Sequence, residues 1–193
     1  LMLYIRMLFS MLVSLYTSRV ILQTMGVEDY GIYNAVGGGV AIFGFINGAM
    51  ANSTSRYLTY TLGKGCSKEL QNIFCTSINI HMLISIVIII LSETIGLWFL
   101  ENKMLIPIER MSAAFWVFQL SLLSSIISII SVPYNSLIIA HEKMDIFAYI
   151  SILEVTLKLG IVYLLSIGNF DKLILYATLL LLVQIIIRYI YKY

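Results

Sequence analysis

The chain has 193 residues, of which 60% are hydrophobic and 11% charged, and its mean hydropathy is +0.95. Soluble domains carry about 25% charged residues, so a soluble fold of this size would lack the polar surface to cover itself. The formal net charge of +2 comes with no basic block, which argues against nucleic acid as a partner. The apolar runs are long and do not alternate with polar residues. The composition therefore predicts an all-α integral membrane protein and not a membrane β-barrel.

Six segments are long and apolar enough to cross a bilayer, for which a helix needs about 20 mainly apolar residues. In chain order they are residues 3–25, 30–58, 73–100, 111–139, 146–167 and 172–191. Arg6 and Arg19 interrupt the first of them. The sequence thus predicts a single six-helix transmembrane bundle over residues 1–193. Both ends of the chain lie in apolar runs, so we expect it to be a fragment of a longer protein.

A short polar connection separates the first two segments. Gly26 can adopt the backbone conformations that end a helix. Glu28 and Asp29 follow it, and negative charge at the start of a helix is stabilised by the helix dipole. The sequence predicts a tight turn here between two antiparallel helices.

The connections between segments differ in basic residues, and this difference predicts the orientation. If the N-terminus is cytoplasmic, seven basic residues face the cytoplasm: Arg6, Arg56, Lys64, Lys68, Lys143, Arg188 and Lys192. Four then face the other side: Arg19, Lys103, Arg110 and Lys172. The positive-inside rule favours this orientation.

Polar and small residues follow one helical face in three of the segments. The first segment has Arg6, Ser10, Ser14 and Thr17. The second has Asn34, Gly38, Ala41, Phe45, Gly48, Asn52 and Arg56. The fourth has Ser121, Ser124, Ser125, Ser128, Ser131 and Asn135. Small residues allow close helix packing, and we favour that interpretation for the glycines. Exposing Asn52 and Arg56 to lipid would be costly, so we favour a hydrated cavity for these two side chains.

Two charged residues lie within the fifth segment. Glu154 and Lys158 are four residues apart, with the acid first, which is the favourable order for a helical ion pair. One interpretation is that they neutralise each other within the membrane. The other is that one of them contacts a substrate or a proton in a cavity. Cys66 and Cys75 form no CxxC pair, and His81 and His141 are far apart, so we expect no metal site.

Three stretches of the chain resemble one known family. They are SRVILQTMGVEDYGIYN at residues 18–34, GAMANSTSRYLTYTLGKG at 48–65 and SVPYNSLIIAHEKMDIFAYISILEVTLKL at 131–159. Their residues and spacing resemble those of the N-terminal half of bacterial polysaccharide-export proteins, the O-antigen-type flippases for lipid-linked oligosaccharides. That family belongs to the superfamily that also contains the multidrug and toxin extrusion (MATE) transporters.

The resemblance implies a fold, a transport function and a location. The fold would be one six-helix lobe of a two-lobe, MATE-like transporter in the bacterial cytoplasmic membrane, whose C-terminal lobe lies outside this chain. By alternating access it would flip undecaprenyl-pyrophosphate-linked oligosaccharide for polysaccharide and lipopolysaccharide biosynthesis. Its other partners would be membrane lipids, and neither catalytic residues nor a cofactor are expected. The pyrophosphate requires cations, and arginine suits phosphate oxygens well. The candidate cavity residues are Arg6, Ser10, Ser14, Asn52, Arg56, Glu154 and Lys158.

Two alternative functions belong to different classes. A drug or cation extruder of the same fold would favour acidic and aromatic cavity residues, whereas the candidates here are more often basic. A membrane-embedded polysaccharide polymerase or ligase would need catalytic residues in a large outer loop. The outer connections here have about ten residues or fewer, too few for such a loop.

Overall fold

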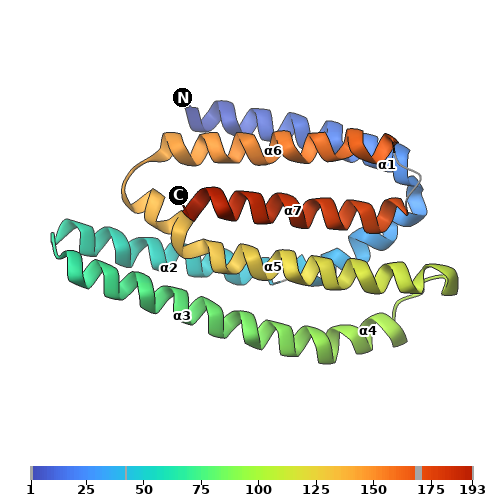
Figure 1. The fold of residues 1–193 in the computed structure, drawn as a ribbon, viewed down its shortest axis with the longest axis horizontal. Helices are drawn as coiled ribbons and strands as arrows, with labels where there is room; N and C mark the ends of the chain where they lie inside the picture. The colour runs from blue at the N-terminus through green and yellow to red at the C-terminus, as the bar shows by residue number, and fades with distance from the viewer. Residues whose placement is uncertain (1, 42, 168–170, 193) are drawn as a thin grey trace.

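The computed structural model describes residues 2–41, 43–167 and 171–192. These residues form helices joined by short connections and contain no strand. The long helical segments run lengthwise beside one another (Figure 1). The prediction of an all-α protein is confirmed for this part of the chain.

The elements follow the order of the predicted segments. They are α1 (Met2–Ala41), α2 (Gly44–Gly63), α3 (Ser67–Leu91), the π-helical turn η1 (Ser92–Gly96), α4 (Leu97–Asn102), the 3-10 turn η2 (Ile108–Arg110), α5 (Met111–Ala140), α6 (Met144–Ile167) and α7 (Lys172–Lys192). Both termini lie toward the end of the bundle that carries the α2–α3 and α5–α6 connections (Figure 1). We call this the inner end, and the opposite end the outer end.

Gly26 divides α1 into two legs that run in opposite directions. It is the one residue inside α1 with non-helical torsion angles, φ 87° and ψ 167°. Few residues other than glycine adopt such a positive φ. The predicted turn between the first two segments is therefore present, and a single residue makes it.

The predicted second segment, 30–58, consists of two helical pieces. The second leg of α1 ends at Ala41 and α2 starts at Gly44, with residue 42 outside the described residues. The Phe43 amide still donates to the Val40 carbonyl oxygen at 3.1 Å, and the Ile46 amide donates to Phe43. The helix is thus interrupted at Phe43, a break that the sequence analysis did not predict.

Five helical stretches are long and apolar enough to cross a membrane: 6–40, 67–102, 108–140, 144–165 and 172–191. The first includes both legs of α1. Helix α2 is not among them, because polar residues fill the stretch from Asn52 to Thr61. The fold is compatible with a multi-pass membrane protein.

Helix α5 is the centre of the packing, because it contacts α1, α2, α3, α6 and α7. Ala113 and Ala114 are almost fully buried near its outer end and allow close approach of the neighbouring helices. Further along the helix, Val117, Phe118 and Ile129 are buried. The main apolar core lies between α1, α5, α6 and α7.

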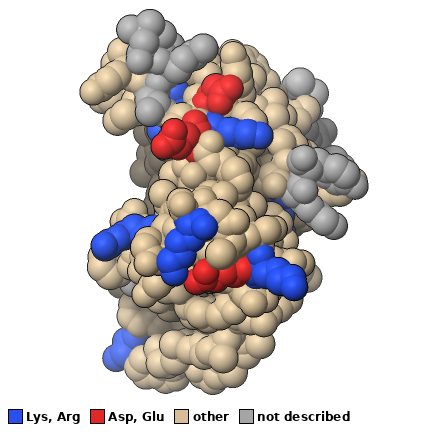
Figure 2. Space-filling model, turned by 90° about the vertical axis from the view of Figure 1, so that its left-hand side faces the viewer, with Lys and Arg blue, Asp and Glu red and all other residues tan. Residues whose placement is uncertain are grey.

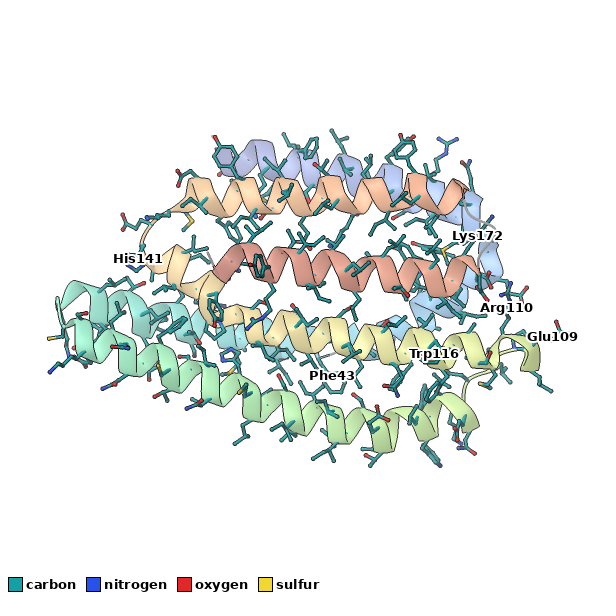
Figure 3. The ribbon with its side chains drawn as sticks, viewed as in Figure 1. Phe43, Glu109, Arg110, Trp116, His141 and Lys172 are labelled. Carbon is teal, nitrogen blue, oxygen red and sulfur yellow. The ribbon has the colours of Figure 1, made fainter. Side chains whose placement is uncertain are left out.

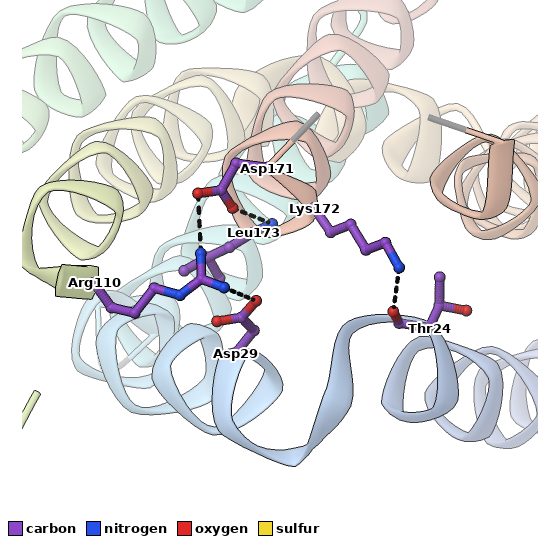
Figure 4. A network of polar contacts seen from close by, with 6 residues as sticks. All are labelled: Thr24, Asp29, Arg110, Asp171, Lys172 and Leu173. Atoms are coloured by element: carbon purple, nitrogen blue, oxygen red, sulfur yellow. Dashed lines mark hydrogen bonds and ion pairs between the residues drawn. The ribbon is translucent and has the colours of Figure 1, made fainter. Parts of the chain in front are cut away.

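A network of charged side chains joins three elements at the outer end (Figure 4). Arg110 Nη2 lies 3.2 Å from Asp29 Oδ2, and Arg110 Nη1 donates to Asp171 Oδ2 at 3.1 Å. Asp171 Oδ1 accepts from the Leu173 amide at the start of α7, and Lys172 Nζ donates to the Thr24 carbonyl oxygen. The network holds the Gly26 turn against the starts of α5 and α7.

The inner end carries charged side chains of both signs. Figure 2 looks onto this end and shows Lys and Arg side chains lying beside Asp and Glu. Lys64 and Glu69 form an ion pair there, with 3.6 Å between Nζ and Oε1. The Glu69 carboxylate, with a smaller effect of Tyr60, raises the pKa of Lys64. Lys64 is therefore charged throughout the physiological pH range, as the predicted orientation requires.

Single-cysteine labelling should show which end faces the cytoplasm. Both chain cysteines are exposed, so they are first replaced by serine. His141 lies at the inner end and Glu109 at the outer end (Figure 3), and both are exposed. We expect a membrane-impermeant maleimide added to intact cells to label Glu109→Cys and not His141→Cys. Labelling of His141→Cys alone would reverse the orientation. We also predict an outer connection at Asn169–Asp171, of which residues 169 and 170 lie outside the described residues.

Candidate functional site

Three adjoining, partly open cavities lie between α1, α2, α5, α6 and α7. The central cavity has a volume of about 480 Å³, the inner cavity about 330 Å³ and the side cavity about 230 Å³. Asn47, Ser128 and Gln184 line both the central and the inner cavity. Tyr33, Asn34 and Lys158 line both the central and the side cavity. We call the three together the polar tract.

Helix α5 provides one wall of the polar tract through its serine face. Ser121, Ser124, Ser125 and Ser128 line the central cavity, and Ser128, Ser131 and Asn135 line the inner cavity. All six polar residues of the predicted stripe therefore reach the tract. Ser131 Oγ donates to the Ile127 carbonyl oxygen at 2.6 Å, as serines in apolar helices commonly do.

The first leg of α1 brings its polar stripe to the side cavity, except for Arg6. Ser10, Ser14 and Thr17 line this cavity. Arg6 lies further toward the inner end, where Nη1 donates to Ser151 Oγ at 3.1 Å and the guanidinium lies 4.7 Å from the centre of the Phe147 ring. Arg6 Nε is buried and has no hydrogen-bond partner among the described residues. Arg6 thus joins α1 to α6 beside the tract.

An ion pair stands where the cavities meet. Lys158 Nζ donates to Glu154 Oε1 at 2.7 Å, and Gln184 Nε2 donates to the same oxygen at 3.4 Å. Lys158 lines the central and side cavities, while Glu154 lines the inner cavity. The two charges neutralise each other in this geometry, and both side chains remain partly exposed, at 40% for Lys158 and 26% for Glu154.

The structure places Asn52 and Arg56 away from the other candidates. They lie on the exposed side of α2 and line a separate, partly open cavity of about 870 Å³ together with Tyr57, Tyr60 and neighbouring small polar residues. Thr54, Leu58 and Thr61 are buried on the opposite side of the helix. Of the seven candidates, Ser10, Ser14, Glu154 and Lys158 line the polar tract and Arg6 lies beside it.

The glycines of the second-segment stripe do not mediate close helix packing within the described residues. Space within 4 Å of a Cβ built on Gly38 or on Gly48 is empty. Gly38 lines the central cavity and Gly48 the inner cavity. The packing interpretation of these glycines is wrong here, because their missing side chains leave room for the cavities instead.

Sequence reasoning missed several residues in the tract or beside it. Asn47 Nδ2 donates to Ser128 Oγ at 3.3 Å across the α2–α5 contact. Arg188 Nη1 donates to Ser131 Oγ at 3.3 Å, and its guanidinium lies 5.1 Å from the centre of the Tyr134 ring. Gln184 lies in an apolar stretch of α7. A polar side chain within a membrane helix often faces a cavity or a partner, so Gln184 could have been predicted from the sequence.

The described residues contain no group of three His, Cys, Asp or Glu side chains that could hold a metal ion. The tract instead offers hydroxyl, amide and phenol groups, with one neutralised ion pair and with Arg6 and Arg188 nearby. Such a surface can hydrogen-bond a polar solute in many orientations. Comparisons with protein-family models, with curated proteins and with solved structures found no match for this chain.

Proposed function

We propose that this chain forms one lobe of a membrane transporter that flips a lipid-linked oligosaccharide across the bacterial cytoplasmic membrane. The observation that carries the proposal is the polar tract itself. Serine, asparagine and glutamine side chains from α1, α2, α5 and α7, together with the Glu154–Lys158 pair of α6, line joined cavities in an otherwise apolar bundle. Polar groups inside a membrane bundle are costly unless they serve a hydrated pathway or a ligand.

The chemistry of the tract suits a sugar that carries a phosphate group. Hydroxyl and amide side chains can donate to and accept from sugar hydroxyls. Arg6 and Arg188 lie at the inner part of the bundle, next to residues of the tract, and arginine can bind phosphate oxygens with two parallel hydrogen bonds. A lipid tail would remain in the surrounding bilayer. In this proposal a second lobe completes the cavity, and the two lobes alternate between inward-open and outward-open states.

A cation extruder of the same fold is the second candidate, because Glu154 lines the inner cavity. Its carboxylate is already bound to Lys158 and Gln184, so the pair adds no net negative charge to the tract. A tract without net negative charge does not attract a cation by its charge. Its hydroxyl and amide groups can still form hydrogen bonds with a sugar or a phosphate group. This difference favours the oligosaccharide.

Filling the central cavity should stop transport without harming the fold. We expect Ser124→Leu, in the protein that contains this chain, to reduce surface polysaccharide by about tenfold or more, equivalent to ~1.4 kcal/mol. Ser112→Leu is the matched control, because Ser112 is an exposed serine of the same helix outside the polar tract. Surface display is measured in a flippase-deleted strain, alongside the amount of protein in the membrane. Failure of the unaltered protein to restore display in strains with several different polysaccharides would contradict the proposed function.

Arg56 tests whether the exposed side of α2 also meets the substrate. Lysine keeps the charge of arginine but lacks the planar fork that binds phosphate with two hydrogen bonds. We expect Arg56→Lys to insert normally and lose much of the display, and Arg56→Ala to lose nearly all of it. Normal display by both variants at normal protein level would show that Arg56 only anchors the helix at the membrane surface.

A further inference from the structure

The side cavity of the polar tract, of about 230 Å³, contains one deeply buried tyrosine in its wall. Tyr176 is 9% exposed, and its hydroxyl makes no hydrogen bond within the described residues. Protein atoms do not enclose this hydroxyl fully, so it can meet a molecule in the cavity. A buried phenol usually has a hydrogen-bond partner, and here that partner has to come from what fills the cavity.

Further polar groups reach the same cavity without a partner. Ser10, Ser14 and Ser18 come from the first leg of α1, and their hydroxyls make no hydrogen bond within the part of the chain that the structure describes. Serines in apolar helices commonly donate to their own backbone, as Ser131 does. Tyr33 adds a second phenol hydroxyl from the other leg. The cavity therefore offers several donors and acceptors at once to a ligand.

Aromatic and aliphatic side chains form the rest of the wall. The rings of Tyr33 and Tyr176 meet edge to face with 4.7 Å between their centres, which fixes their orientation. Val155 and Leu180 add aliphatic surface from α6 and α7. The face of an aromatic ring carries partial negative charge and attracts C–H groups, whose hydrogens are partly positive. A ligand that matches this wall has both hydroxyl groups and an apolar C–H face.

The size and the charge of the cavity limit the ligand further. Its 230 Å³ is less than the about 300–1,000 Å³ of sites for drug-sized molecules, so the cavity suits a single small ring. The charge of Lys158 is neutralised by Glu154 at 2.7 Å, so an anion would lose its water without gaining a net opposite charge. An apolar chain would leave the hydroxyl groups of the wall without hydrogen bonds, which is costly.

We propose that the side cavity binds one uncharged sugar ring of the transported oligosaccharide. Its C–H face lies against Tyr33 and Tyr176, and its hydroxyls bond to the serines of α1. This inference rests on the proposed function and adds where one sugar is held and to which class it belongs. Ser14 and Ser18 are exposed, so the ring can enter from the open side of the cavity. Ser14 follows Arg6 by eight residues, about 12 Å along the helix, so the sugar lies further toward the outer end than this arginine.

Saturation-transfer NMR with soluble sugars tests the proposal. The purified protein that contains this chain is kept in a detergent without a sugar headgroup. The probes are the methyl glycosides of glucose, galactose, mannose, rhamnose and N-acetylglucosamine, together with methyl glucuronide, which carries a carboxylate. We expect at least one of the uncharged sugars to receive saturation from the protein and the glucuronide to receive several-fold less.

Variants locate the binding within the protein. Tyr33→Phe and Tyr176→Phe keep the rings and remove one hydroxyl each, so we expect about two- to tenfold weaker binding, as for loss of one hydrogen bond. Tyr149→Phe should bind as the unaltered protein does, because Tyr149 is 62% exposed and lies outside the polar tract. Ser14→Phe should fill the cavity and abolish binding, whereas Ser112→Phe, at an exposed serine outside the tract, should leave it unchanged.

Three outcomes would overturn the proposal. They are no saturation transfer to any of the uncharged sugars, transfer that Tyr33→Phe and Tyr176→Phe both leave unchanged, and equal transfer to the glucuronide. The display assay separates this inference from the proposed function. Restored display without sugar binding would remove the sugar site and keep the transport function. Sugar binding without restored display would keep a sugar site and contradict the transport function.

Discussion

Replacing Gly26 with alanine is expected to destabilise the bundle by about 1–3 kcal/mol, although the new methyl group would contact nothing. Its φ of 87° and ψ of 167° are accessible to glycine and strained for other residues. Space within 4 Å of the added Cβ is empty, so the cost would come from the backbone alone. Thermal unfolding of the purified protein in detergent, followed by circular dichroism, measures the change.

Gly31→Ala is the matched control for this prediction. Gly31 lies five residues further along α1 in helical conformation, and the space beside it is also open. Alanine favours a helix over glycine by about 0.5–1 kcal/mol, so this variant should be as stable as the unaltered protein or more stable. Equal stability of the two alanine variants would show that Gly26 adopts a conformation open to any residue.

Removing the charge of Glu154 alone should be more harmful than removing both charges of its ion pair. Glu154→Gln leaves Lys158 without its carboxylate inside the bundle, at a cost of about 1–3 kcal/mol. This cost is below the 3–5 kcal/mol of a fully buried pair, because both side chains are partly exposed. The double variant Glu154→Gln, Lys158→Met has no unpaired charge and should recover the stability. The unfolding temperature and the protein level in the membrane report this difference.

Transport by the double variant then decides the role of Lys158. If the charges of Glu154 and Lys158 only neutralise each other, the double variant should restore surface polysaccharide in full. A stable double variant that fails to restore it would show that Lys158 contacts the substrate from the central cavity. Glu154→Gln with unchanged stability would show instead that Lys158 is solvated well enough in the cavity to remain charged alone.

Local patterns predicted the helices and the turn because their causes are local. The apolar segments at 73–100 and 111–139 and the serine face of α5 follow from patterns within the sequence. The turn at Gly26 was predicted from that glycine and from the two acidic residues after it, Glu28 and Asp29. No local pattern predicts the break at Phe43. Three consecutive glycines precede it, and all three lie within the helix.

The candidate site was only partly predictable because its polar groups meet across helices. The pair Glu154–Lys158 lies within one turn of a helix, and spacing alone predicted it. Gln184 completes that pair from α7, and Asn47 meets Ser128 from α2, which no spacing could predict. Asn52 and Arg56 share a face with Gly48, yet the structure turns that part of α2 away from the tract. One helical face can thus begin inside a cavity and end outside it.

The charged network at the outer end has a consequence for the order of assembly during synthesis. Asp29 and Arg110 are both made before α6 and α7, so they can pair while the chain is still incomplete. Asp171 follows Arg110 by 61 residues and can join only when α7 is being made. The two carboxylates that hold Arg110 are therefore acquired one after the other, and the outer end of the bundle closes only when α7 is in place.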